Sequence, residues 1–325
     1  MHNMIAILLS SYNGEIYIRE QIETIINQTN YEWDLFIRDD GSTDKTLDVI
    51  NYFVKKYEHI HLVQDDLGNI GPLRSFKELL TYANDFQYVM FCDQDDIWKR
   101  DKIEVTLKKM LTLEKKDNFV LVYTNYEIKR QAKLTTAYQS NMQAVSIANN
   151  ILVQSWLMGC TMMMNNNLAS FACDIPIVAE NHDNWYAKVA ALIADIGYVH
   201  ETTMIHQLHD HNVTSRLNSS NKIVQLKSLI SWFKTRNEEF DNQYSTIIEL
   251  RELCQKKVKS LKTEKVMNNY IKMFQKKNVF SKLSLICQNK FRAYALNQNI
   301  KFLIIVLFGK RTRSNNELYR RKIDD

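Results

Sequence analysis

Tyr88-Val89-Met90-Phe91-Cys92-Asp93-Gln94-Asp95-Asp96 decides the fold of this chain, because an apolar run leads directly into three carboxylates. A short continuous apolar run predicts a strand buried on both faces, as in a parallel sheet. Carboxylates crowded at a strand end repel one another by about 1–4 kcal/mol per pair unless a cation offsets their charge. Hard oxygen ligands of this kind suit Mg²⁺ or Mn²⁺. The segment therefore predicts a divalent-cation site, and a solvated acidic loop is the competing interpretation.

Outward from this segment, other short apolar runs alternate with helical patterns. The predicted strands are Met4–Leu9, Asp34–Arg38, Ile60–Val63, Tyr88–Cys92 and Phe119–Tyr123. This alternation predicts an α/β fold, with a mostly parallel central sheet flanked by helices. Ligands of open α/β sheets bind outside the carboxyl ends of the strands, where polar clusters follow the apolar runs here. We therefore expect these clusters to converge on one cleft.

A second acidic cluster, Asp39-Asp40-Gly41-Ser42-Thr43-Asp44, follows the second predicted strand. An EF-hand loop starting at Asp39 would require Glu at its twelfth position, which is Ile50. Capping of the next helix by Asp44 is the simplest interpretation. A carboxylate here can also accept hydrogen bonds from a base or a ribose. The chain contains neither a Walker-type loop nor a G-x-G-x-x-G loop, so the two kinds of nucleotide-binding site that use these loops are disfavoured.

Charge divides the 325 residues into two parts. Lys222–Asp325 carries 23 Lys and Arg against 9 Asp and Glu, whereas Met1–Asn221 carries 19 against 28. An acidic first part suits a cation site, and a basic second part suits an anionic surface. Amphipathic Lys-rich patterns after about residue 216 predict a helical extension. We therefore predict a catalytic domain at 1–216 and a basic helical extension at 217–325.

Cysteine usage and hydropathy exclude several classes of protein. The five cysteines are odd in number and include no Cys-x-x-Cys pair, which disfavours a disulfide scaffold and favours a reducing cytosol. The run Met4–Leu9 is shorter than a signal-peptide core, and no stretch reaches the roughly 20 apolar residues that span a bilayer. We expect a cytoplasmic protein.

Three blocks resemble the signature blocks of glycosyltransferase family 2 in order and spacing: Ser10–Gly14, Asp39–Asp44 and Phe91–Trp98. Gly159–Thr161, His182-Asp183 and His209-x-x-Asn212-Val213 resemble its later blocks. The resemblance covers about residues 4 to 216. Within the family, the chain is most similar to bacterial rhamnosyltransferases of cell-surface polysaccharide assembly.

The resemblance implies the GT-A fold, a nucleotide-sugar donor and a role for each matched residue. Ser11, Tyr12 and Asn13 would line the nucleotide base, and Asp40 would accept a hydrogen bond from a pyrimidine. Asp93 would face the ribose and the metal, Asp95 would ligate the metal, and His209 would be a further ligand near the diphosphate. Asp183 would be the general base of a direct displacement that inverts the anomeric centre, although a helix N-terminal cap is the competing interpretation.

One departure from the subgroup lies just before His209. The subgroup often carries Tyr-Arg where this chain has His206 and Gln207, so an expected arginine is missing. Phosphate contacts or donor choice would then differ, and Arg74 or Arg216 could compensate.

The apolar run Phe302–Phe308 in the basic extension has two interpretations. In the first interpretation, the run forms a helix that lies on the anionic inner face of the cell membrane, which its length and its flanking Lys and Arg residues suit. A core helix docked on the catalytic domain or a second subunit is the alternative. A nucleic-acid-binding role lacks any recognition-helix or RRM motif.

We expect a dTDP- or UDP-sugar donor, Mn²⁺ or Mg²⁺, and a glycan or lipid-linked acceptor. The oligomeric state is left open, and a homo-oligomer is one of the alternatives. The alternative function is a protein that only binds a nucleotide sugar or acts as a scaffold through its basic extension.

Overall fold

The computed structural model describes residues 4–130, 133–137, 150–208, 222–257, 260–293 and 296–312. Contacts divide the chain into two compact units. Unit 1 comprises Met1–Asn141, Leu157–Asp174 and Ala194–Asp210, and unit 2 comprises Met142–Trp156, Ile175–Ile193 and His211–Asp325. The predicted boundary at 216/217 lies outside the described residues, and the division into 1–216 and 217–325 stays a prediction.

Unit 1 is built on one sheet that contains all five predicted strands. The strands are β1 (Ile5–Ser11), β2 (Trp33–Asp39), β3 (Ile60–Val63), β4 (Tyr88–Asp93), β5 (Asp96–Trp98), β6 (Val120–Arg130), β7 (Lys133–Ala137), β8 (Met162–Asn165) and β9 (Asp195–Leu208). Their order is β3-β2-β1-β4-β8-β6-β9-β5, with β7 paired to β6. Strands β3, β2, β1 and β4 run parallel to one another, as predicted.

The other half of the sheet is mixed. β8 runs antiparallel to both β4 and β6, whereas β6 and β9 form a long parallel pair with register shifts near Asn125. β5 is a short strand antiparallel to the far end of β9, and this pairing sets Asp96 opposite His206. The acidic segment after β4 therefore becomes an edge strand rather than an open loop.

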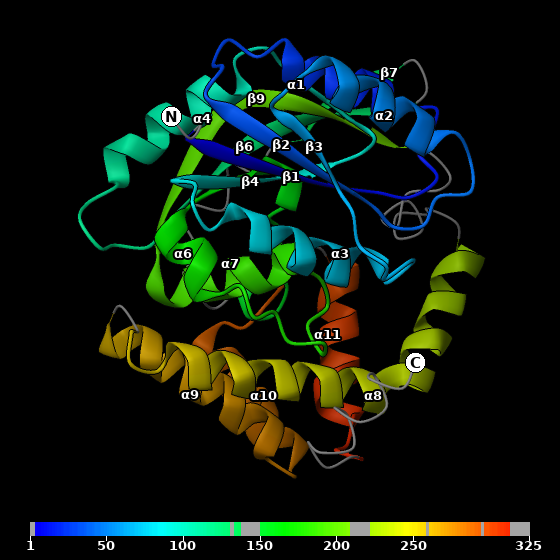
Figure 1. The fold of residues 1–325 in the computed structure, drawn as a ribbon. Helices are drawn as coiled ribbons and strands as arrows, with labels where there is room; N and C mark the ends of the chain where they lie inside the picture. Colours follow the sequence, from blue (N-terminus) through cyan, green and yellow to red (C-terminus); the bar gives the residue numbers. More distant parts are fainter. Residues whose placement is uncertain are drawn as a thin grey trace. The chain divides into compact units, whose positions relative to one another are not determined.

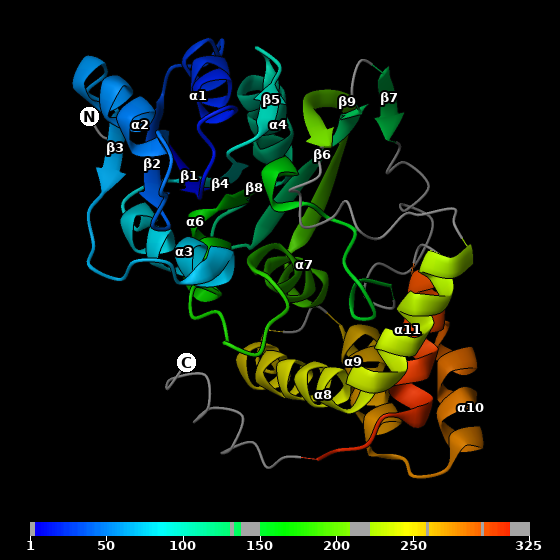
Figure 2. The same ribbon diagram turned by 90° about the vertical axis from the view of Figure 1, so that its right-hand side faces the viewer.

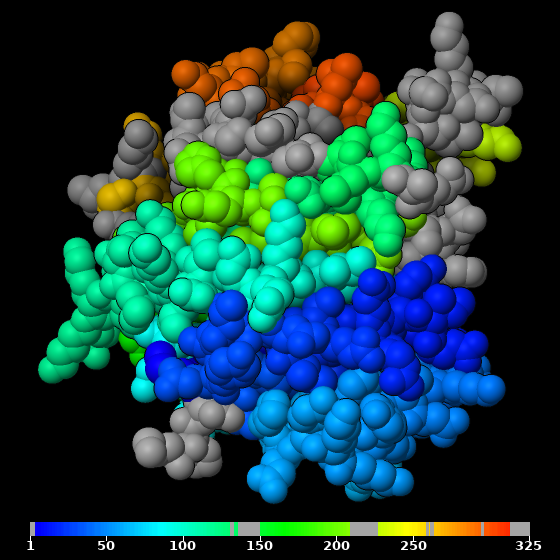
Figure 3. Space-filling model, turned by 90° about the horizontal axis from the view of Figure 1, so that it is seen from above, coloured from blue at the N-terminus to red at the C-terminus, as the bar shows by residue number. Residues whose placement is uncertain are grey.

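Helices cover both faces of this sheet (Figures 1 and 2). They are α1 (Ile18–Ile26), α2 (Thr46–Lys56), α3 (Gly71–Leu80), α4 (Lys102–Leu113) and α6 (Asn166–Phe171). α1, α2 and α4 lie on one face, and α3 and α6 lie on the other. In Figure 3, α1 and α2 in blue and α4 in blue-green lie side by side across the first face. α1 buries Ile18, Ile22 and Ile25, which recur at helical spacing.

Apolar burial explains why β1 lies inside the sheet. Residues Ile5 to Leu9 are all 0% exposed, because neighbouring strands and helices on both faces enclose them. The parallel register then aligns the strand ends, pairing Ser11 with Asp39 and Ser10 with Asp93. The expected convergence of the first polar clusters at the carboxyl edge is confirmed.

Unit 2 is helical. Its helices are α7 (His182–Ile193), α8 (Lys222–Cys254), α9 (Leu261–Gln275), α10 (Val279–Asn289) and α11 (Leu296–Phe308), and α8 to α11 pack together in Figure 2. α7, which the sequence assigned to the catalytic domain, groups with this unit. The helical character predicted after residue 216 is confirmed for the described residues.

The apolar run in α11 is largely a core segment. Phe302, Ile304, Ile305 and Val306 are buried, and the buried Lys282 Nζ donates to the carbonyl of Val306 at 2.6 Å. The run therefore belongs to the core of unit 2, whereas Phe308 at its end is 51% exposed. Docking on the catalytic domain or on a second subunit stays a prediction. Among the described residues, no helix has the length and apolarity needed to cross a membrane.

Candidate functional site

The loop after β1 is fastened to the acidic segment after β4 by one side chain. Gln94 accepts a hydrogen bond from Tyr12 N at 2.9 Å and donates one to Tyr12 O at 3.0 Å. A Cβ at Gly14 would lie 2.2 Å from Gln94 Oε1, so any other residue there would displace the Gln94 amide from these hydrogen bonds. The ring of Tyr12 is 48% exposed. The first and third sequence blocks therefore form one rigid rim that presents an aromatic ring.

The loop after β1 is also joined to the loop after β2. Asn13 N donates to Ser42 Oγ at 2.8 Å, and Thr43 N donates to Asn13 Oδ1 at 2.8 Å. Asn13 has a φ of 47°, a left-handed conformation that asparagine tolerates better than most side chains. Asp44 accepts from Thr46 N at 3.0 Å at the start of α2, so the helix-capping interpretation is part of its role.

The two adjacent carboxylates after β2 have different surroundings. Asp39 is partly exposed and accepts from Ser11 Oγ at 3.1 Å and Ser42 N at 2.8 Å. Asp40 is 3% exposed and accepts from Arg38 Nη1 at 2.6 Å and from the backbone of Ile70 at 2.8 Å. Asp40 Oδ2 accepts a hydrogen bond from Gly71 N at 2.9 Å. Asp39 is therefore the more accessible carboxylate, and the base contact assigned to Asp40 stays a prediction.

Arg38 holds the carboxylates of Asp40 and Asp65 in place. It is 1% exposed and donates to Asp65 through Nε at 2.7 Å and through Nη2 at 3.0 Å, in the bidentate geometry that guanidinium favours. It also donates to Gly68 O at 2.9 Å and Ser75 Oγ at 2.6 Å. Sequence reasoning missed this residue, because nothing in a single Arg on a strand indicates two carboxylate partners.

The third block forms a carboxylate cluster at the end of β4. Ligand-capable atoms of Asp93, Asp96 and Cys160 all lie within 4.8 Å of one another. Asp93 is partly exposed, Asp95 is 9% exposed and Asp96 is fully buried. The structure thus brings Asp93 together with Asp96 and Cys160, and the assignment of Asp95 as a metal ligand stays a prediction.

The donor set suits a hard cation. Burial, together with the negative charges of Asp96 and Asp93, raises the pKa of the Cys160 thiol well above its ordinary value. Sulfur is a soft ligand that selects metals such as Zn²⁺ or Cu(I) rather than Mg²⁺ or Mn²⁺. The carboxylate oxygens remain, and these are what Mg²⁺ and Mn²⁺ prefer.

The missing subgroup arginine is explained by two polar residues of β9. His206 Nδ1 lies 2.8 Å from Asp96 Oδ1, and Gln207 Nε2 donates to the carbonyl of Asp95 at 3.1 Å. Burial lowers the pKa of His206, but the hydrogen bond and charge of Asp96 outweigh it, so the net shift is upward. His206 and Gln207 therefore hold the backbone and carboxylate of the acidic segment in place.

A buried lysine lies in the same cluster. Lys102 is fully buried, its Nζ lies 3.3 Å from Thr203 Oγ1, and it sits 4.9 Å from the centre of the Trp98 ring. Burial lowers the pKa of Lys102 to about 8, although the negative charge of Asp96 is among the effects that oppose this shift. The burial of Lys102 could not be predicted from the sequence, because a lysine at the start of a helix is ordinarily exposed.

Asp183 lies in unit 2, at the second residue of α7, and is partly exposed. Its Oδ1 accepts from Asn184 N at 2.6 Å, and a helix N-terminus favours a negatively charged side chain. Burial lowers the pKa of the neighbouring His182 to about 3, so this imidazole is neutral at physiological pH. The role of Asp183 as general base stays a prediction, as does a capping role. His209 and Arg216 lie outside the described residues, and Arg74 lies on α3.

Comparison with known families agrees with these blocks. Residues 6–169 match the sequence profile of the family described as Glycosyl transferase family 2. This match spans the Ser11, Asp39 and Asp93 clusters, and it ends before α7.

Among curated proteins, the putative teichuronic acid biosynthesis glycosyltransferase TuaG of Bacillus subtilis is 26% identical over 243 residues, which is 73% of this chain and 88% of TuaG. The dTDP-rhamnosyl transferase RfbG of Shigella flexneri is 36% identical over 99 residues, which is 30% of this chain and 34% of RfbG. Among solved structures, S. aureus TarS 1–349 in complex with UDP-GlcNAc has a TM-score of 0.55 at 15% identity, covering 98% of this chain and 91% of TarS 1–349. At that identity, the structural likeness shows the fold alone.

Proposed function

The chain belongs to glycosyltransferase family 2, and from this premise we propose a metal-dependent, inverting transferase that moves a sugar from a nucleoside diphosphate to an acceptor hydroxyl. The observation that carries this proposal is the carboxylate cluster of Asp93 and Asp96 at the carboxyl edge of a parallel sheet. Ligands of open α/β sheets bind at this edge, and a diphosphate requires positive charge there.

The donor side of the proposal uses the rim of unit 1. The exposed ring of Tyr12 offers a face for the nucleotide base, with Ser11, Asn13 and the Asp39–Asp40 pair beside it. Asp93, the last residue of β4 and the partner of Ser10 of β1, would face the ribose, as the family resemblance implies. The cross-links through Gln94 preorganise this rim, which lowers the entropy lost on binding.

Asp93 and Asp95 would hold Mn²⁺ or Mg²⁺, with His209 as a further ligand. The bound cation would offset the negative charge that develops on the departing diphosphate. His206 and Gln207 support this arrangement by fixing Asp96 and the backbone of Asp95.

The transfer itself needs one displacement. The acceptor oxygen forms a bond to the anomeric carbon while its proton passes to the Asp183 carboxylate. The bond from the anomeric carbon to the donor phosphate breaks, and its electron pair leaves on the nucleoside diphosphate. A single displacement of this kind inverts the anomeric centre.

The names of similar proteins support a choice of donor and of acceptor. RfbG is named as a dTDP-rhamnosyl transferase, TuaG is named for teichuronic acid biosynthesis, and the TarS structure holds UDP-GlcNAc. We therefore propose a dTDP- or UDP-linked rhamnose, hexose or N-acetylhexosamine as donor. The acceptor would be a glycan or lipid-linked glycan of the bacterial surface. A binding or scaffolding protein without turnover is the second candidate.

A thermal-shift panel tests the donor assignment. We expect Mn²⁺ with UDP or dTDP to stabilise the protein, while Mn²⁺ with ADP or GDP does so less. A ligand at 100 times its Kd adds about 2.7 kcal/mol to the free energy of unfolding. The same measurement on Asp95→Ala should lose the metal-dependent part of the shift.

Asp174→Ala is the matched control, because that carboxylate is 93% exposed and pairs only with a surface lysine, Lys77. If no nucleotide raises the melting temperature of the wild type, the transferase proposal fails and the scaffolding candidate is favoured. An equal shift in Asp95→Ala would remove Asp95 from the cation site.

We also propose that unit 2 contacts an anionic membrane from the cytoplasmic side. Ile230, Phe233 and Phe308 are 50%, 42% and 51% exposed, and the two Phe rings lie 5.6 Å apart. We call these three residues the apolar patch. Exposed Lys234 and Lys310 flank it in sequence, and each cation near an anionic leaflet adds about 1 kcal/mol.

Vesicle sedimentation tests this surface. We expect the protein to sediment with phosphatidylglycerol vesicles and to remain in solution with phosphatidylcholine vesicles. Phe233→Ser should weaken sedimentation, whereas Leu134→Ser, at an exposed leucine of unit 1, should not. Equal sedimentation of the wild type and Phe233→Ser would rule out the apolar patch.

A further inference from the structure

Unit 2 contains a pocket of about 390 Å³ that lies between α7, α8 and α11. Residues 153–154 and 178–180 complete its wall, so the whole lining belongs to one compact unit. Its volume falls within the range of about 300–1,000 Å³ that is typical of small-molecule sites. None of the residues assigned above to the donor, the cation or the general base lines this pocket.

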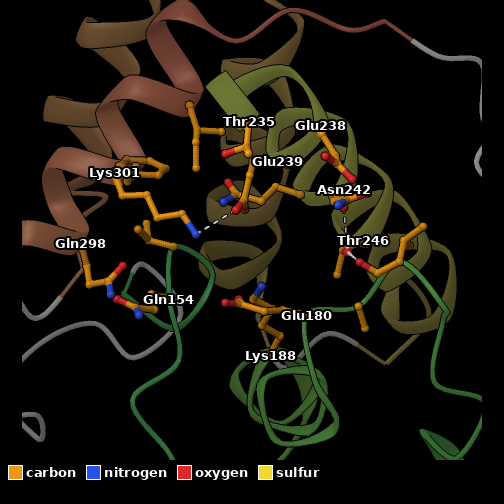
Figure 4. A pocket seen from close by; sticks show the side chains of 16 residues that line it. Gln154, Glu180, Lys188, Thr235, Glu238, Glu239, Asn242, Thr246, Gln298 and Lys301 are labelled. Atoms are coloured by element: carbon orange, nitrogen blue, oxygen red, sulfur yellow. Dashed lines mark hydrogen bonds and ion pairs between the residues drawn. The ribbon is translucent and has the colours of Figure 1, made fainter. Parts of the chain in front are cut away.

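The charges of the lining nearly balance. Glu180, Glu238 and Glu239 contribute carboxylates, and Lys188 and Lys301 contribute ammonium groups. Lys301 and Glu239 form an ion pair at 3.0 Å (Figure 4). Burial lowers the pKa of Lys188, and the negative charge of Glu180 opposes that shift. Three carboxylates repel an anionic ligand and two ammonium groups repel a cationic one, so the lining favours a neutral ligand.

Amides add both donors and acceptors to the wall. Gln154 and Gln298 lie next to each other in Figure 4, and Gln243 also lines the pocket. Each of these amide groups can offer N–H donors and an oxygen acceptor to a ligand.

Apolar side chains supply the remaining wall. Val178, Phe302 and Ile305 are among the lining residues, and each is largely buried. A lining that combines apolar side chains with carboxylates, amides and ammonium groups matches a molecule with hydroxyls on its edge and C–H groups on its faces. Each hydroxyl can donate to a carboxylate or an amide oxygen and accept from an ammonium or an amide N–H.

We propose that this pocket binds a neutral sugar residue of the acceptor glycan. The inference that the ligand is a sugar follows from the lining residues alone. The inference that this sugar belongs to the acceptor rests on the proposed function. The pocket and Asp183 share α7, because Glu180 precedes this helix and Lys188 lies within it. The general base and the acceptor subsite would therefore be carried by the same rigid element.

Saturation-transfer NMR on the full chain tests the pocket with methyl glycosides of rhamnose, glucose and N-acetylglucosamine. We expect transfer to at least one glycoside, and about tenfold weaker binding in Thr235→Trp, which places an indole at the exposed rim. Gln298→Ala, on the opposite helix, should also weaken binding. Lys234→Trp is the matched control, since it places the same ring one residue away and outside the lining.

The outcomes separate the pocket from the proposed function. Absence of transfer to every glycoside, or equal binding in Thr235→Trp and the wild type, overturns the pocket assignment. Competition by inorganic phosphate at the same site would overturn the choice of a neutral ligand. Nucleotide-dependent thermal shifts in these variants report the donor site independently. Glycoside binding without any nucleotide shift would keep the sugar site and remove the transferase.

Discussion

Replacing Asp183 with asparagine is expected to lower kcat by about 10²–10⁴-fold, the usual contribution of a general base. Asparagine keeps the size and hydrogen-bonding shape of the side chain but cannot take a proton from the acceptor hydroxyl. Asp183 lies in α7 of unit 2, whereas the residues assigned to the donor lie in unit 1. Nucleotide binding, measured by thermal shift, should therefore stay within error of the wild type.

Two controls accompany this measurement. Asp174→Asn removes the same charge from an exposed carboxylate and should leave kcat unchanged. The melting temperature of Asp183→Asn should stay near that of the wild type, because losing a helix-terminal charge costs about 0.3–1 kcal/mol. A kcat within twofold of the wild type would remove Asp183 as the base and leave the capping interpretation.

Replacing Arg38 with methionine is expected to destabilise the protein by about 3–5 kcal/mol, the range for breaking a buried ion pair by removing one partner. Arg38 and Asp40 have side chains that are 1% and 4% exposed, with Nη1 and Oδ1 2.6 Å apart. Methionine fills the space of the stem but leaves the Asp40 carboxylate buried without its counter-charge. Urea unfolding would measure the change.

Arg19→Met is the matched control, because Arg19 pairs with Glu23 at 3.9 Å and both side chains are about half exposed. Such surface pairs contribute about 0–1 kcal/mol. The double variant Arg38→Met/Asp40→Asn should recover part of the loss, since it removes both charges. A loss no larger than that of Arg19→Met would show that the buried pair contributes little.

The second ion pair of Arg38, with Asp65 at 2.7 Å, gives a pH signature. The hydrogen bond from Arg38 holds the pKa of Asp65 below its ordinary value, although burial opposes this shift. The resulting stabilisation is present above the ordinary pKa of an aspartate and is lost as pH falls through the lowered value. Arg38→Met should therefore flatten this acidic limb of the stability curve.

Much of unit 1 could be predicted from local patterns. The apolar runs that became β1, β4 and the first part of β6 are continuous, and a strand enclosed on both faces requires just such a run. The polar clusters that follow these runs had to meet at one edge once the strands were parallel, as the pairing of Ser11 with Asp39 shows. The family blocks were readable for the same reason, since each lies within a few residues of a strand end.

Other features depend on partners far apart in the chain. Two adjacent aspartates look alike in sequence, yet Asp40 is buried against Arg38 and Asp39 is partly exposed. The substitution of the subgroup Tyr-Arg by His206 and Gln207 became understandable only through Asp96, which lies 110 residues from His206. No local pattern specifies such a pair, because the free energy of a buried charge depends on which groups surround it.

The amino-acid sequence by itself determined the α/β fold of unit 1, its family and the position of its carboxylates, because strand burial and strand-end chemistry are properties of short segments. Only the tertiary structure decided how Gln94 joins two loops, which of the aspartates are accessible, and that residues as distant as Gln154, Lys188 and Gln298 line one pocket. These features arise from packing between segments, and packing depends on the shape and polarity of every neighbour rather than on the spacing along one strand or helix.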